Sequence, residues 1–160
     1  MFFALFVITV SAVDQSKFRT CKETGFCRRN RIRQDLPPQF SVLPSSVVTH
    51  GKDGLTALLQ STQLEAPPLK MGITIYDNGV VRMQIREANP EKPRWEASDI
   101  IMEDELTSIE PSITAQDSSL RLEFGDERAL VVEYTPFSAT LLIDGEPSAV
   151  VNGRGLFHFE

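Results

Sequence analysis

Residues that bind metals are scarce in this sequence. Among its 160 residues there are two cysteines, Cys21 and Cys27, and two histidines, His50 and His158. A structural zinc site needs about four such ligands close together, and both histidines lie far in sequence from the cysteines. We therefore expect no metal site, and nothing else in the sequence indicates a cofactor.

Familiar catalytic motifs are also missing. There is no G-x-S-x-G turn, and Gly153-Arg154-Gly155 precedes a predicted strand, whereas a phosphate loop precedes a helix. The acidic run Glu103-Asp104-Glu105 lacks the spaced oxygens and the glycine of a calcium loop. Twenty-two acidic residues give many accidental carboxylate pairs, so composition selects none for glycoside hydrolysis. We expect no catalytic residue here, and the sequence leaves any substrate-binding residues undefined.

The sequence contains no apolar run of the roughly 18 residues that a membrane-spanning helix needs. Its first twelve residues, MFFALFVITVSA, are apolar and end with Val10 and Ala12, small residues suited to positions −3 and −1 of a cleavage site. The alternative interpretation is a buried N-terminal strand. Because the run is short and lacks a basic start, the residues alone leave both open; we favour a signal peptide over residues 1–12.

Charge is unevenly distributed along the chain. Residues 17–33 contain seven Lys and Arg against Glu23 alone, a net charge of +6, so the total of −6 leaves −12 for the rest. A basic arm can bind nucleic acid, but no RNA-binding motif accompanies this one. We interpret residues 13–38, which end at Pro37-Pro38, as an arm that packs on an acidic surface of its own domain or of a partner.

Alternating apolar residues predict several β-strands. In residues 70–86, Ile73 and Ile75 lead to Asp77-Asn78-Gly79, which suits a tight hairpin turn. After the turn, one face is expected to hold the apolar residues Val81, Met83 and Ile85, and the other the polar residues Arg82, Gln84 and Arg86. Residues 55–60 form another candidate strand, although Leu58 breaks its alternation.

The last third of the chain has the clearest alternation. Strands are predicted at 120–124, 130–134, 139–143 and 149–152, with turns at 125–128 and 144–145. Short strands at this spacing indicate an all-β, antiparallel β-sandwich over residues 39–160. No segment has a convincing helical period, and residues 99–105 could form one turn at most. The hydrophobic fraction of 41% favours a folded domain over disorder.

Several segments resemble glycoside hydrolase family 31, and within it the alpha subunits of endoplasmic-reticulum glucosidase II. They are VDQSKFRTC (13–21), GFCRR (25–29), the hairpin with its exit Pro93-Arg94-Trp95, and Pro136-Phe137 with VNGRGLFHFE (151–160). They occur in the order that the family has. The resemblance implies the galactose-mutarotase-like N-terminal β-sandwich of these enzymes, in incomplete form.

The same resemblance implies a parent enzyme, a retaining α-glucosidase that trims α-1,3-linked glucose from N-glycans with two carboxylates. Those residues belong to a later (β/α)₈ barrel, which needs about 250 residues, and its motif W-x-D-M-N-E is not matched by Trp95-Glu96-Ala97-Ser98. We therefore expect an inactive front fragment or short isoform. The implied partners are the glucosidase II beta subunit and the missing barrel, with N-glycan bound only by the full-length parent, and with no nucleic acid and no membrane span.

Whether the two cysteines form a disulfide depends on the cellular compartment of the chain. From the residues alone, Cys21 and Cys27 could form a disulfide in an oxidising compartment or remain free thiols in the cytosol. The family has a similar pair, and its members lie in the endoplasmic-reticulum lumen. The resemblance therefore implies a Cys21–Cys27 disulfide and that location.

Alternative functions remain. One is a freestanding carbohydrate- or protein-binding sandwich, which would need exposed aromatic residues; another is a gene fragment without a stable product. Trp95 could stack on a sugar, but we expect it to cap the core with Arg94 over its face. We also expect Phe157 to Phe159 to lie in a strand, with His158 on one of its faces. If the chain stops inside that strand, a sheet edge is left unpaired and the chain should associate.

Overall fold

The computed structural model describes residues 15–31, 39–62, 66–92, 94–95 and 106–159. The chain forms two compact units, residues 1–36 and 37–160. The first contains two short 3₁₀ helices, η1 (Gln15–Lys17) and η2 (Cys21–Glu23), and the helix α1 (Gly25–Arg31). The second contains the β-strands and the 3₁₀ helix η4 (Gly51–Asp53).

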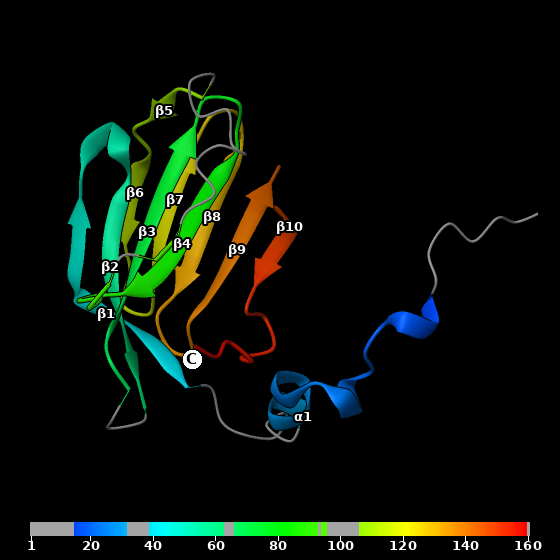
Figure 1. Cartoon of the computed structure of the whole chain (residues 1–160). Coiled ribbons are helices and arrows are strands. Elements are labelled where there is room, and N and C mark those ends of the chain that lie inside the picture. The colour runs from blue at the N-terminus through cyan, green and yellow to red at the C-terminus, as the bar shows by residue number, and fades with distance from the viewer. Residues whose placement is uncertain (1–14, 32–38, 63–65, 93, 96–105, 160) are drawn as a thin grey trace, which may run out of the picture. The chain divides into compact units, whose positions relative to one another are not determined.

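The second unit is built from two antiparallel sheets (Figure 1). Sheet A has the order β1-β2-β3-β4, with β5 also paired to β3; its strands are β1 (Phe40–Thr49), β2 (Leu55–Ser61), β3 (Leu69–Tyr76), β4 (Val81–Glu87) and β5 (Ser108–Ile109). Sheet B has the order β10-β9-β8-β7-β6; its strands are β6 (Ser112–Ala115), β7 (Ser119–Phe124), β8 (Arg128–Glu133), β9 (Ser138–Ile143) and β10 (Glu146–Val151). The predicted antiparallel β-sandwich is confirmed.

Alternation decides which side chains enter the interior between the sheets. In β3, Met71, Ile73 and Ile75 are at most 1% exposed, as is Leu69, while Lys70, between Leu69 and Met71, is exposed. In sheet B, Leu122 and Val132 are fully buried on neighbouring strands. Since side chains two apart share a face of a strand, these residues form one apolar layer. Burial of this layer is the main source of stability for the fold.

The hairpin predicted at 70–86 is present as β3 and β4. Met71 pairs with Ile85 and Ile73 with Met83. In the turn, the N–H of Gly79 donates to the carbonyl of Tyr76 at 2.9 Å, and Gly79 has a φ of 86°. A Cβ on Gly79 would lie only 1.8 Å from the guanidinium of Arg128 in sheet B. The positive φ of this turn favours glycine, and a Cβ here would also have to displace the end of the flexible Arg128 side chain.

Some details differ from the predictions. Leu58 does not interrupt β2: it points outward, pairs in register with Leu43, and leaves Ala57 and Leu59 buried. A helix is present, which the sequence did not indicate. With seven residues, α1 is too short to show an apolar period, and the adjacent disulfide helps to hold it. The single helical turn considered at 99–105 lies outside the described residues.

The base of the sandwich is closed by three phenylalanines. The Phe157 ring makes edge contacts with Phe40, at 5.0 Å between centroids, and with Phe137, at 5.9 Å. Backbone bonds reinforce this closure: the N–H of Phe137 donates to the carbonyl of Phe40 at 3.0 Å. Three parts of the chain therefore meet at the base of the sandwich: strand β1, the connection between β8 and β9, and the C-terminal segment.

Residues 156–159 do not form the strand that we predicted. Asn152, with a φ of 57°, turns the chain out of the direction of β10. Its side chain donates to the carbonyl of Phe137 at 2.5 Å and accepts from the N–H of Phe157 at 2.7 Å. These two bonds direct the Phe157 side chain toward the base of the core. The alternation of Phe157 and Phe159 in the sequence therefore belongs to an irregular segment and not to a strand. His158 lies in this segment, with Nδ1 3.2 Å from the Gln39 amide oxygen.

An ion pair lies beside this closure. The guanidinium of Arg94 donates from both Nε and Nη2 to the carboxylate of Glu87, with Nε 2.8 Å from Oε2. The same guanidinium lies 4.9 Å from the centroid of the Phe159 ring. Hydrogen bonding from Arg94 lowers the pKa of Glu87 to about 2. The end of β4 is thereby linked to the C-terminal segment.

The assigned faces of β4 can be tested by acidic substitution. Ile85 is half-buried and packs against the apolar layer, so Ile85→Asp should lower the free energy of unfolding by about 1–3 kcal/mol. Gln84→Asp should change stability little, because with its amide correctly oriented the Gln84 oxygen lies 2.8 and 3.1 Å from the guanidinium nitrogens of Arg82 and Arg86. Thermal unfolding measures both, and equal melting temperatures would contradict this assignment.

The Glu87–Arg94 pair should be visible in a pH titration. Because the pKa of Glu87 is depressed in the folded protein, the stabilisation by this pair is present above the ordinary carboxyl pKa and is lost as pH falls toward 2. Arg94→Gln should return the pKa of Glu87 to its usual range, whereas the control Arg121→Gln should leave it low. NMR of the side-chain carboxyl carbons measures the midpoint. An ordinary midpoint in the unsubstituted chain would refute the pairing.

Candidate functional surfaces

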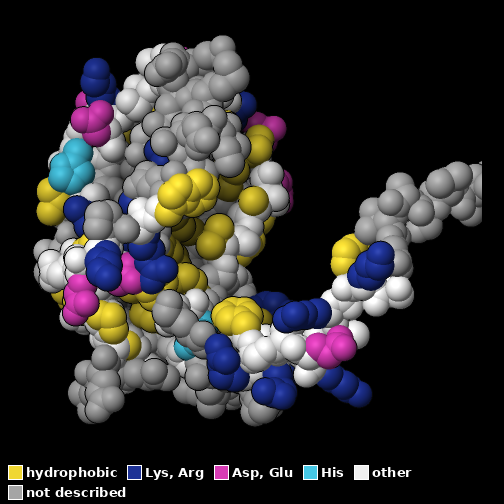
Figure 2. All heavy atoms as spheres, viewed as in Figure 1, with side chains coloured by type: hydrophobic (Ala, Val, Ile, Leu, Met, Phe, Trp, Pro, Cys, Tyr) yellow, Lys and Arg dark blue, Asp and Glu magenta, His cyan; other side chains and the backbone are white. Residues whose placement is uncertain are grey.

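Among the residues that the structure describes, nothing covers one side of the sandwich. The edge strands β4 and β10 lie on this side, and every residue of β10 is exposed. Val81, Met83 and Ile85 of β4 are only half-buried, although they point toward the interior. Opposite them, Ile143 is 37% exposed and Val151 47%. Figure 2 shows apolar side chains uncovered on this face. An exposed apolar seam bordered by unpaired strand edges is typical of a surface that packs against other protein.

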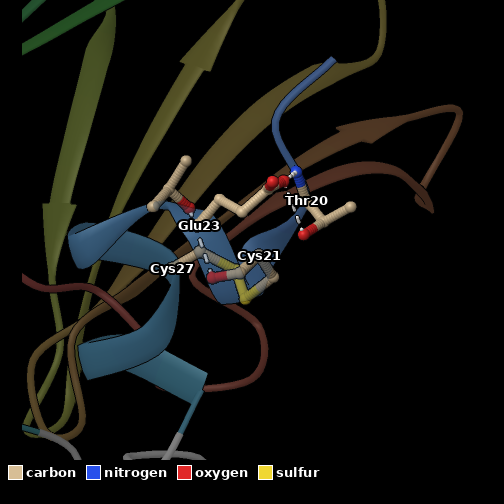
Figure 3. Close-up of a disulfide and its surroundings, with 5 residues drawn as sticks. Thr20, Cys21, Glu23 and Cys27 are labelled. Atoms are coloured by element: carbon tan, nitrogen blue, oxygen red, sulfur yellow. Dashed lines mark hydrogen bonds between the residues drawn. A yellow bond between two sulfur atoms is a disulfide. The ribbon is translucent and has the colours of Figure 1, made fainter. Parts of the chain in front are cut away.

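The first unit is held by covalent and local bonds. A disulfide joins Cys21 and Cys27, whose Cα atoms are 5.2 Å apart (Figure 3). Beside it, the Glu23 carboxylate accepts from the backbone N–H of Thr20 at 2.7 Å and from its hydroxyl at 2.9 Å. These bonds lower the pKa of Glu23, the backbone bond most. They fix the start of η2 without an apolar core.

The surface of this unit is basic and includes two exposed aromatic rings. No side chain described between residues 16 and 31 is buried. Phe18 is 62% exposed and Phe26 is 60% exposed. Arg28, Arg29 and Arg31 lie in the last turn of α1, where the helix dipole favours positive charge. Phenylalanine and arginine are enriched in protein interfaces, so the unit has the composition of a binding surface.

The residues singled out in the sequence are not brought together into one site. His50 Nε2 lies 3.0 Å from the Thr56 hydroxyl, while His158 is at the base of the sandwich. Gly153-Arg154-Gly155 is a turn after β10. The acidic run 103–105 lies outside the described residues. Over the described ranges, no three His, Cys, Asp or Glu side chains gather as metal ligands would.

Trp95 does not cap the core. It is 80% exposed, and Arg94 lies over Phe159 rather than over the indole. The physical reason is that the bidentate bond to Glu87 fixes the guanidinium beside the C-terminal segment. Sequence reasoning could not find this arrangement, because Phe159 is distant along the chain.

A polar hollow of about 500 Å³ lies at the end of sheet B where β7–β8 and β9–β10 turn. One wall is the ion pair of Arg121 with Glu123, at 2.8 Å. Arg128, Glu127 and Asp144 add charges of both signs. This mixture gives the hollow no net preference for an anion or a cation. In the described part of the chain, no helix is long and apolar enough to cross a membrane.

Comparison with known proteins identifies the domain. Residues 70–160, more than half of the chain, match the model of the glycosyl hydrolase 31 N-terminal galactose mutarotase-like domain. Neutral alpha-glucosidase AB of Dictyostelium discoideum is 28% identical over 98% of this chain, and that of Mus musculus is 31% identical over 93%. The chain spans 18% and 16% of these two relatives.

Solved structures give the same fold. A glucosidase II alpha subunit bound to Glc1Man2 superposes with a TM-score of 0.77 at 18% identity, covering 89% of this chain and 18% of that one. The catalytic subunit in a heterodimer with the binding domain of the regulatory subunit gives a TM-score of 0.76 at 17% identity, with the same coverage. The fold and family that the sequence predicted are confirmed. This chain belongs to glycosyl hydrolase family 31, and its sandwich is the family's N-terminal galactose mutarotase-like domain.

Proposed function

We propose that this chain is the N-terminal, non-catalytic scaffold of a glucosidase II alpha-type enzyme that removes glucose from N-glycans. One observation carries the proposal: relatives named neutral alpha-glucosidase AB align with 93–98% of this chain, yet the chain spans only 16–18% of them. A (β/α)₈ barrel alone needs about 250 residues. The chemistry therefore belongs to sequence beyond the part that aligns here.

The open side of the sandwich supports a scaffold role. Its exposed residues, Ile143 and Val151, and the half-buried residues of β4 form an apolar surface next to two edge strands that no other described strand pairs with. In a longer parent chain, this surface would pack against a following domain and position it. The sandwich then contributes rigidity and orientation rather than reacting groups.

The proposal includes a location and a partner. The apolar segment 1–12 acts as a signal peptide, the chain enters the endoplasmic-reticulum lumen, and the parent pairs with a regulatory beta subunit. Support comes from a structural neighbour that is a heterodimer with the binding domain of such a subunit. The disulfide suits an oxidising compartment.

A second candidate function is a freestanding carbohydrate-binding sandwich. One observation favours it: Trp95, the only tryptophan, is 80% exposed and so could stack on a sugar. Against it, the phenylalanines Phe40, Phe124 and Phe137 are buried, so they cannot contribute to an aromatic platform beside Trp95.

A chimera tests the scaffold role. Residues 1–160 would replace the corresponding region of a glucosidase II alpha subunit, and hydrolysis of p-nitrophenyl α-glucoside would be measured. We expect an active chimera and no activity from the chain alone, because the two carboxylates about 5 Å apart that retaining hydrolysis needs are in the barrel. Activity of the isolated chain, or a folded but inactive chimera, would overturn the proposal. Quenching of Trp95 fluorescence by oligosaccharides would favour the second candidate.

Cysteine pairing tests the proposed compartment. Chain secreted from eukaryotic cells should yield one non-reduced peptide pair that links Cys21 to Cys27. Removing the bond with Cys21→Ser and Cys27→Ser should loosen the first unit but leave the thermal transition of the sandwich unchanged, because the two units are separate. The measurements are peptide mapping by mass spectrometry and thermal unfolding. Two thiols that react with alkylating reagent in the secreted chain would refute the pairing.

A further inference from the structure

We propose that the arm formed by residues 15–31 is the surface that binds the regulatory subunit, through an acidic and partly apolar face of that subunit's binding domain. This inference rests on the partnership proposed above. It assigns a binding role to a part of the chain that lies outside the sandwich.

The first argument is that the arm is ordered without a core. None of its described side chains is buried. Order comes instead from the Cys21–Cys27 disulfide and from the reciprocal bonds of Thr20 and Glu23. A segment stabilised in this way gives little to the sandwich, but it loses less entropy on binding than a flexible tail would. Pre-organisation of this kind is useful for recognition.

The second argument is the chemistry of the arm surface. The arm contains six basic side chains, Lys17, Arg19, Lys22, Arg28, Arg29 and Arg31, and a single acidic one, Glu23. Among them, Phe18 and Phe26 each expose at least 60% of their surface. The complementary partner is a protein face with carboxylates around apolar pockets. With seven residues, α1 is too short for the extended apolar stripe of a membrane-surface helix.

The third argument is the position of the arm in the chain. The arm belongs to the compact unit that precedes the sandwich, so it lies outside the domain that defines the family. The relatives named neutral alpha-glucosidase AB nevertheless align over 93–98% of the chain. An arm outside the family-wide domain fits a property beyond the family-wide fold. Pairing with a regulatory subunit is such a property.

The experiment measures binding to the isolated binding domain of a glucosidase II regulatory subunit by biolayer interferometry. The ligands are the full 160-residue chain and the chimera described above. Two arm variants are compared with the unsubstituted proteins: Arg28→Glu with Arg29→Glu and Arg31→Glu, and Phe26→Ser. Matched controls in the sandwich are Lys52→Glu and Val48→Ser, both at exposed positions. An unchanged thermal transition shows that the sandwich of each variant is folded.

We expect each arm variant to bind about tenfold or more weakly, and the controls to bind like the unsubstituted protein. Binding should also weaken as salt rises, and less steeply in the charge-reversed variant. Unchanged binding by the arm variants would overturn the role of the arm but keep the partnership. No binding by either unsubstituted protein would overturn both. The arm would be assigned to membranes instead if the unsubstituted chain bound phosphatidylserine vesicles but not the regulatory binding domain, and if the arm variants lost the binding to vesicles.

Discussion

The two sheets depend on the closure at their base. Among the described residues, the strands of one sheet are not hydrogen-bonded to those of the other, so the sheets are joined by side-chain packing and by the contacts at this end. Phe137 fixes them: it is fully buried, contacts Phe157, and donates its N–H to Phe40 in sheet A. A second backbone bond joins the N–H of Val42 to the carbonyl of Tyr134 at 2.9 Å. Both bonds join sheet A to the β8–β9 connection at the same end of the sandwich.

Local sequence determined much of the fold, and distant contacts determined the rest. The faces of Ile73, Met83 and Leu122 were predictable because side-chain direction alternates within each strand. The turn at Gly79 was predictable because its residue type permits positive φ. The position of Trp95 was predicted wrongly because Arg94 lies over the ring of Phe159, which is far along the chain, and not over the indole.

The predictions for the irregular segments were wrong for related reasons. Phe157 and Phe159 alternate as a strand would, but the turn that prevents pairing is set by the side-chain bonds of Asn152, which no pattern reveals. The helix α1 is held by a disulfide rather than by an apolar stripe. The cysteine pair itself was found through family resemblance, and the arm's exposed aromatic residues became apparent only in the structure. Sequence periodicity therefore predicts the strands that pack in layers, but it does not predict segments whose conformation is set by a few specific side-chain bonds or by a disulfide.

Two glycines in hairpin turns differ in how much substitution they should tolerate. Gly125, with a φ of 57°, faces open space, so only its backbone conformation restricts it, and asparagine is an acceptable replacement. Gly79 meets that restriction and also the guanidinium of Arg128 from the other sheet. Shortening Arg128 would relieve the clash without relieving the backbone. Position 125 should therefore accept asparagine, while a side chain at position 79 must also displace the end of the Arg128 side chain.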